Sequence, residues 1–255
     1  MKLALIPPID LLEYTEETNM QLMLPHLLKD ERYEYVYGRH CKAEDEFVIL
    51  DNGEAEGETI EWDSLWSLVR EYRPDEFVLP DTIADADETM EKAQEFRRKF
   101  GNSLLWGPQV LFSIMFVIQG RTMEEFEACI RFAKKREWIN VIGIPRHAIG
   151  TLGSPRARYD LALRANQLTD KPIHLLGASP LAPTELRDLK WWKLSQVRST
   201  DTSMPFNYAY YDKVVRQGNN YSRPEEYFDL PMQSFSMDKV DQNVQLLMEW
   251  TGNDL

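Results

Sequence analysis

The chain has 255 residues, of which 43% are hydrophobic and 28% charged, a balance typical of a globular protein and not of a disordered one. Its two cysteines, Cys41 and Cys129, exclude a disulfide scaffold and a four-cysteine zinc site. The absence of any run of about 18 apolar residues excludes a membrane span. Because the sequence also lacks a signal-peptide pattern, we expect a cytoplasmic protein.

The net charge of −13 is unevenly distributed along the chain. Residues 1–100 carry a net charge of −14, residues 101–120 have no charged group, residues 121–223 carry +7 and residues 224–255 carry −6. Such asymmetry is typical of proteins that present a basic face to a nucleic acid. It also fits an uneven, solvated surface, so the charge alone leaves both interpretations open.

Short apolar runs that each end in a polar or glycine residue recur along the chain and predict buried strands. The eight runs are Leu3–Ile9, Tyr33–Tyr37, Phe47–Leu50, Phe77–Pro80, Phe112–Ile118, Ile139–Pro145, Ile173–Leu176 and Gln196–Thr200. Only eight residues separate Gly38 from Phe47, too few for a helix. We therefore expect a hairpin or a bare crossover between the second and third strands.

Helical patterns lie between most of these runs. Apolar residues repeat at helical spacing in Trp62–Tyr72 and in Met90–Phe96, and Thr122–Glu137 opens with a Thr-x-x-Glu capping box. A further helix is predicted over Thr184–Lys193, and a last one runs from about Met237 to Trp250. In that last helix Val240, Val244, Leu247 and Met248 would face the rest of the protein.

Strands that alternate with helices predict parallel βα units, and eight of them in a chain of this length favour a (β/α)8 TIM-type barrel. We assign the barrel to residues 1–223 and a C-terminal helical extension that packs on it to residues 224–255. An open doubly wound sheet is the competing architecture. Neither G-x-G-x-x-G nor G-x-x-x-x-G-K-[ST] is present, so no nucleotide-phosphate loop is predicted.

Polar side chains follow four of the predicted strands: Asp51, Asp81, Gln119 and Asp201. In a barrel these positions converge at the C-terminal ends of the strands, where active sites form. A single aspartate there is usually a helix cap or a turn residue. Two converging carboxylates suit glycosyl transfer, and an aspartate with a glutamine suits the edge of a purine. His174 lies in an apolar strand and is interpreted as a hydrogen-bonded core histidine.

The order and spacing of six motifs over residues 47–205 resemble those of tRNA-guanine transglycosylases. The motifs are Leu50-Asp-Asn-Gly53, Leu79-Pro-Asp81, Phe116-Val-Ile-Gln-Gly120, Val141-Ile-Gly-Ile-Pro-Arg146, Pro172-Ile-His-Leu-Leu-Gly177 and Val197-Arg-Ser-Thr-Asp201. Their particular forms are most similar to a shorter, phage-encoded branch, some members of which insert 7-deazaguanines into DNA. This branch would act in the host cytoplasm.

The resemblance implies a base exchange through a covalent glycosyl-enzyme. Asp201 would attack C1′ and expel guanine, and Asp51 would act as general acid and base. A 7-deazaguanine such as preQ0 would then take the place of guanine. Asp81 and Gln119 would hydrogen-bond the purine, and Gly120, Gly143 and Ile144 would make further contacts to the substrate. No cofactor and no metal ion are expected.

One departure from the family concerns its structural zinc site. No cysteine follows Cys129, so the cysteine cluster of the tRNA enzymes is absent, which favours DNA over tRNA as the polymer.

Glu54 and Glu56 follow the Asp51 turn and would raise the pKa of Asp51 by like-charge repulsion.

The basic middle of the chain supplies candidate phosphate contacts: Arg146, Arg156, Arg158 and Arg198. Solvated arginines on helices are the plain alternative. Two other functions stay open, a nucleoside or glycoside hydrolase and a non-catalytic purine- or DNA-binding subunit of a modification complex. A homodimer or a partner modification protein is also compatible with the sequence.

Overall fold

A computed structural model describes residues 1–58, 60–104, 112–178, 185, 194, 196–216 and 221–252. Its centre is one sheet of eight parallel strands. The strands are β1 (Lys2–Leu5), β2 (Met20–Met23), β3 (Phe47–Leu50), β4 (Glu76–Val78), β5 (Ser113–Val117), β6 (Val141–Pro145), β7 (Ile173–Leu176) and β8 (Val197–Thr202). The TIM-like α/β fold predicted from the sequence is confirmed.

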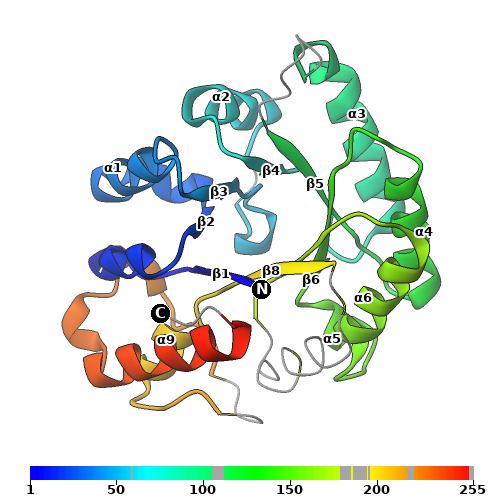
Figure 1. The fold of residues 1–255 in the computed structure, drawn as a ribbon. Helices are drawn as coiled ribbons and strands as arrows, with labels where there is room; N and C mark the ends of the chain where they lie inside the picture. The colour runs from blue at the N-terminus through cyan, green and yellow to red at the C-terminus, as the bar shows by residue number, and fades with distance from the viewer. Residues whose placement is uncertain are drawn as a thin grey trace.

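The sheet curves into a nearly closed barrel (Figure 1). Hydrogen-bonded pairs run β1-β8-β7-β6-β5-β4-β3-β2, so the last strand of the chain returns to pair with the first. The remaining seam lies between β1 and β2, which are neighbours without a ladder among the described residues. Because all strands are parallel, their C-terminal ends lie at one end of the barrel, and the residues that follow them meet there.

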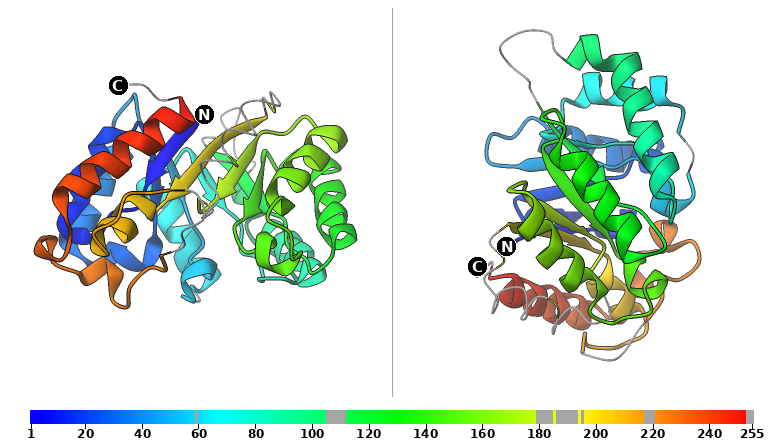
Figure 2. Two further views of the ribbon diagram at one scale, coloured as in Figure 1. Left: turned by 90° about the horizontal axis from the view of Figure 1, so that it is seen from below. Right: turned by 90° about the vertical axis from the view of Figure 1, so that its right-hand side faces the viewer.

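Helices surround the barrel (Figures 1 and 2). The α-helices are α1 (Glu31–His40), α2 (Trp62–Tyr72), α3 (Ala86–Leu104), α4 (Met123–Lys134), α5 (Ala148–Thr151), α6 (Ala157–Leu168), α8 (Met204–Tyr210) and α9 (Met237–Thr251). Short 3-10 helices are η1 (Ile9–Glu17), η2 (Pro25–Lys29), η3 (Glu54–Glu56), η4 (Tyr227–Asp229) and η5 (Met232–Ser234). As predicted, Thr122 caps α4, since its hydroxyl accepts a hydrogen bond from the Glu125 amide. The helix predicted over Thr184–Lys193 lies outside the described residues, Glu185 excepted.

The second predicted strand is wrong, because Tyr33–Tyr37 belongs to helix α1. Asp30 caps this helix, and its side chain accepts hydrogen bonds from the amides of Arg32 and Tyr33. Tyr33 and Tyr37 are one helical turn apart, and their rings stack with centroids 4.3 Å apart on the buried side. The true β2 is Met20–Met23, so the connection to β3 contains a helix and is neither a hairpin nor a bare crossover.

The C-terminal helix α9 packs against α8 and β1. Its residues Val240, Val244, Leu247 and Met248 are buried, as predicted, in an apolar cluster that also holds Leu3, Leu5 and Phe206. The amino group of Met1 donates a hydrogen bond to the carbonyl of Thr251, which joins the start of β1 to the end of α9. Helix α9 therefore covers the part of the barrel where β1 meets its neighbours (Figure 2).

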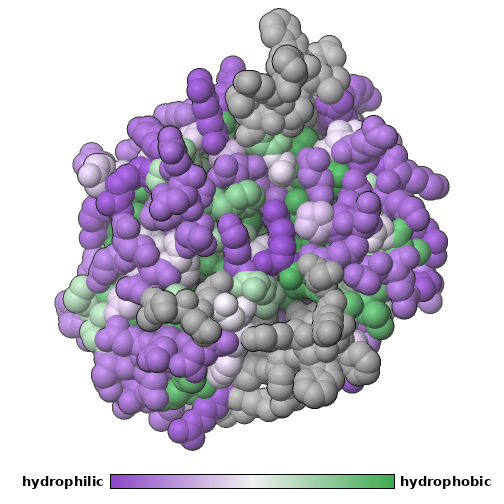
Figure 3. Space-filling view, in the orientation of Figure 1, coloured by the Kyte–Doolittle hydropathy of each residue, from purple (hydrophilic) through white to green (hydrophobic). Residues whose placement is uncertain are grey.

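The apolar side chains lie mainly inside the protein. Figure 3 shows hydrophilic residues over most of the face seen there, with apolar residues in small areas between them. None of the described helices is both long enough and apolar enough to cross a membrane.

Candidate active site

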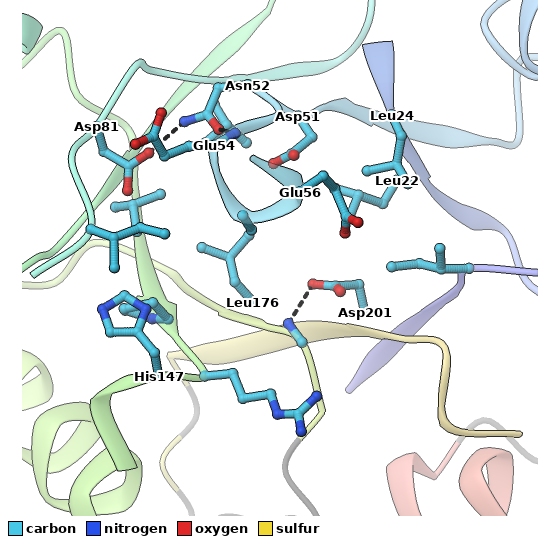
Figure 4. Close-up of a pocket in the computed structure, with 18 of the residues that line it drawn as sticks. Leu22, Leu24, Asp51, Asn52, Glu54, Glu56, Asp81, His147, Leu176 and Asp201 are labelled. Carbon is cyan, nitrogen blue, oxygen red and sulfur yellow. Dashed lines mark hydrogen bonds between the residues drawn. The ribbon is translucent and has the colours of Figure 1, made fainter. Parts of the chain in front are cut away.

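A cavity of about 670 Å³ opens at the C-terminal ends of the strands. Its apolar wall includes Leu22, Val78, Val117 and Leu176, which come from four different strands. Five carboxyl groups line it: those of Asp51, Asp81 and Asp201 at the strand ends, and those of Glu54 and Glu56 in η3. In Figure 4 Asp51 and Asp81 lie along one side of the cavity, Asp201 lies on the other, and Leu176 stands between them. The structure thus brings together all four polar residues predicted at strand ends, since Gln119 also lines the cavity.

Asp51 follows β3 and is only 6% exposed. Its Oδ2 accepts a hydrogen bond of 3.0 Å from the amide of Gly53, where the backbone has φ +82°. Burial raises the pKa of Asp51 to about 7; the Gly53 hydrogen bond opposes this rise, and the charges of Asp201 and Asp81 add to it. The pKa of Asp51 is therefore raised, as predicted, but the charges that add to the rise are those of Asp201 and Asp81 and not those of Glu54 and Glu56. A carboxyl group of this kind exchanges protons near neutral pH.

Asp81 follows β4 and is held by two amide side chains. Asn52 Nδ2 donates to its Oδ1 over 2.7 Å, and Gln119 Nε2 donates to its Oδ2 over 2.5 Å. Burial raises the pKa of Asp81 to about 6, against the effect of these two hydrogen bonds. Gln119 is itself fixed, because its Oε1 accepts from the amide of Ala84, a residue with φ +59°. Asp81 and Gln119 therefore present one rigid polar surface to the cavity.

Asp201 lies on β8 and is 3% exposed. Its Oδ1 accepts hydrogen bonds from the amide of Gly177, over 2.9 Å, and from Nε2 of His174, over 3.0 Å. Gly177 has φ +68°, a conformation that side chains disfavour, which explains a glycine at the end of β7. His174 is buried and hydrogen-bonded as predicted, but its partner is the candidate nucleophile.

Three predicted substrate contacts do not line the cavity: Gly120, Gly143 and Ile144. A Cβ on Gly120 would lie 2.7 Å from Cβ of Glu125, so this glycine allows β5 to lead closely into α4. A Cβ on Gly143 would lie 2.9 Å from Cδ1 of Leu176 and 3.2 Å from Cγ2 of Val117. Gly143 therefore makes room for two side chains of the cavity wall. Ile144 is fully buried in the hydrophobic core.

Two of the predicted phosphate contacts are exposed at this end of the barrel. Arg146 follows β6 and lines the cavity, with no hydrogen-bond or ion-pair partner among the described residues. Arg156 precedes α6, is exposed, and lies 4.7 Å above the ring of Tyr159. Both can reach a ligand that approaches the strand ends.

The other two arginines do not fit the predicted role. The side chain of Arg158 is 0% exposed, donates to the carbonyl of Gly177 and lies 3.5 Å from Glu185. Arg158 therefore stabilises the turn at Gly177, whose amide holds Asp201, and it cannot reach a phosphate. Arg198 lies near the start of β8, at the opposite end of the barrel, where it pairs with the buried carboxylate of Glu76 on β4.

Several cavity residues were not predicted from the sequence. The sequence indicates only a turn at Asn52, yet the side chain of Asn52 donates a hydrogen bond to Asp81. Asn207 on α8 is 3% exposed, and its Oδ1 has no partner among the described residues. Arg223, whose side chain pairs with Glu56, reaches the cavity from the C-terminal part of the chain. No local pattern marks these contacts, because each joins segments that are distant in sequence.

Among the described residues, no three His, Cys, Asp or Glu side chains form a group that could hold a metal ion. Comparison with models of known protein families and with curated proteins gave no match to this chain. The interpretation of the site therefore depends on its own geometry and on the sequence motifs.

Proposed function

We propose that this protein is a base-exchange glycosyltransferase that replaces guanine in a polynucleotide, with DNA favoured, by a 7-deazaguanine such as preQ0. The observation that carries the proposal is the different setting of the three aspartate carboxyl groups in the cavity. Asp201 accepts two hydrogen bonds on one oxygen, Asp51 is buried with a pKa of about 7, and Asp81 is held by two amides. These settings suit a nucleophile, a proton carrier and a group that orients a base.

The exchange has two halves. Asp201 attacks C1′ of the target nucleotide, and the electrons of the glycosidic bond leave with the purine, which takes a proton from Asp51. The incoming base then gives its proton to Asp51 and attacks C1′, which returns the electron pair to the carboxylate of Asp201. Two displacements retain the configuration at C1′.

The residues around the cavity suit a nucleotide whose purine faces Asp81 and Gln119. Asp81 and Gln119, which are hydrogen-bonded to each other, would meet the purine edge, and Arg146 lines the cavity next to Gly177, whose amide holds Asp201. The exposed Arg146 and Arg156 supply positive charge at the same end of the barrel. The preference for DNA rests on the missing cysteine cluster and on the resemblance to the phage branch.

The test is expression in cells that make preQ0, followed by mass spectrometry of nucleosides from DNA and tRNA, with Asp201→Ala as the control. A deazaguanine nucleoside in DNA that is absent with the variant is the expected result. The same nucleoside in tRNA alone would overturn the choice of DNA. Base release without incorporation would identify a hydrolase. Binding without either reaction would identify a purine- or DNA-binding subunit.

Reversing the charge of Arg146 is expected to weaken DNA binding. Arg146→Glu removes a cation at the cavity, so the slope of log affinity against log salt should fall by about 0.9 for one lost phosphate contact. The matched control is Arg70→Glu, because Arg70 is exposed near the C-terminal end of α2, which lies at the other end of the barrel. Salt titrations of DNA binding measure both variants. Equal effects in the two would show that Arg146 acts only through overall charge.

A further inference from the structure

The two oxygens of the Asp201 carboxylate have different environments. Oδ1 accepts hydrogen bonds from the Gly177 amide and from Nε2 of His174. Oδ2 has no hydrogen-bond partner among the described residues, and Asp201 lines the cavity. The carboxylate is therefore held through one oxygen while the other stays available to a ligand.

His174 is fixed from its other side as well. The side chain is 0% exposed, and its Nδ1 lies 2.8 Å from the hydroxyl oxygen of Ser199. His174 and Ser199 are paired in the register of β7 and β8, and Asp201 lies two residues beyond Ser199 on the same face of β8. A strand pair thus sets the position of the imidazole relative to the carboxylate.

A second carboxylate lies deeper in the barrel. Glu76 on β4 is buried and pairs with Arg198, which lies three residues before Asp201 on β8. Because His174 is paired with Ser199, its imidazole lies between the level of the Arg198–Glu76 pair and that of Asp201 along the barrel. This arrangement favours a proton on the nitrogen that faces Asp201, because Nε2 without a proton would place a lone pair against a carboxylate oxygen.

We propose that His174 is a positioning residue for the nucleophile: it donates Nε2–H to Oδ1 of Asp201 and so directs Oδ2 at C1′. The proposal rests on the proposed glycosyl transfer and adds to it the identity of the attacking oxygen. A lone pair of Oδ2 forms the bond to C1′, and Oδ1 becomes the carbonyl oxygen of the ester. When the second base displaces the ester, the electron pair returns to the carboxylate.

The hydrogen bonds to Oδ1 act mainly on the second half of the exchange. As the Oδ2–C1′ bond breaks, negative charge develops on both oxygens, and the Gly177 amide and His174 already face Oδ1. Without His174, breakdown of the glycosyl-enzyme should slow more than its formation. This asymmetry separates a positioning role from simple support of the fold.

The test compares His174→Gln with His174→Phe. A glutamine amide nitrogen can take the place of Nε2 as donor, whereas phenylalanine fills the space without a donor. We expect kcat to fall about 10- to 100-fold in His174→Phe, with accumulation of the glycosyl-enzyme and little change in the KM of the incoming base. His174→Gln should recover most of this loss. Equal losses in the two variants, or a loss confined to KM, would overturn the proposal.

Nuclear magnetic resonance of the wild-type imidazole tests the hydrogen bond without reference to activity. We expect 15N shifts that place a proton on Nε2 of His174, and a change of the Nε2–H resonance in Asp201→Ala. An imidazole protonated on Nδ1 alone would overturn the proposal even in an active enzyme. Conversely, a protonated Nε2 in a protein without exchange activity would refute the proposed function while the contact itself stands.

Discussion

Replacing Asp201 with asparagine is expected to abolish base exchange, with a loss of at least about 10⁴-fold in the single-turnover rate. The amide oxygen of asparagine can still accept hydrogen bonds from the Gly177 amide and from His174, so the local structure should persist. A neutral amide is not a nucleophile, so no ester to C1′ can form. Rapid-quench kinetics and the mass of the denatured protein–DNA adduct measure the rate and the intermediate.

The matched control is Asp170→Asn, which removes one negative charge from an exposed residue that precedes β7, at the opposite end of the barrel. This variant should keep the wild-type rate and the covalent adduct. Thermal unfolding of Asp201→Asn should show a folded protein, which excludes loss of activity through misfolding. An adduct that still forms in Asp201→Asn would move the nucleophile to another residue, with Asp51 the first candidate.

Most of the fold was predictable because seven of the eight strands overlap a predicted run, although β8 is mostly polar and has Val197 as its one apolar residue. Buried parallel strands are continuous apolar runs, and the runs that contain β3 and β7 match those strands residue for residue. The failure at β2 has a physical cause. The tyrosines of Tyr33–Tyr37 are apolar enough to suggest a strand, but the Asp30 cap and the stacking of Tyr33 on Tyr37 stabilise a helix.

The site was predictable as far as it depends on position after a strand. Asp51, Asp81, Gln119 and Asp201 each follow or end a strand, so the topology alone makes them converge. Contacts between neighbouring strands were not predictable, because the pairing of His174 with Asp201 requires the register of β7 against β8. Without this register His174 cannot be distinguished from any other buried histidine.

The exposure of the arginines was also not predictable from the sequence. Arg156 and Arg158 are two positions apart, yet one is exposed and the other is completely buried beneath Gly177. On a helix two positions correspond to about 200° of rotation, so neighbouring arginines face opposite sides. A count of basic residues therefore locates a basic segment but not the side chains that can meet a phosphate.

Asp51→Asn is expected to stabilise the protein at high pH. The folded-state pKa of about 7 lies above the unfolded value of about 3.9, so the folded protein keeps a proton that the unfolded chain loses. The contribution of Asp51 to wild-type stability should consequently fall as the pH rises from about 4 to about 7, by about 4 kcal/mol at most. Asparagine removes this loss, and the two proteins should converge near pH 4. Denaturant unfolding between pH 4 and pH 8 measures the difference, with Asp170→Asn as the control that should follow wild type.

Asp51→Asn should also lower activity. The effect of this buried carboxyl group on stability can therefore be separated from its role in proton transfer. Asparagine cannot carry the proton between the outgoing and incoming bases, so kcat should fall by about 10²- to 10⁴-fold. The limb of the pH–rate profile near pH 7 should disappear with it. Replacing a residue that stabilises the fold would destabilise the protein, whereas replacing Asp51 should stabilise the protein and lower its activity. If Asp51→Asn instead unfolds more easily at pH 8, the carboxylate is a structural group and the proton carrier must be sought elsewhere in the cavity, first at Asp81, whose pKa is about 6.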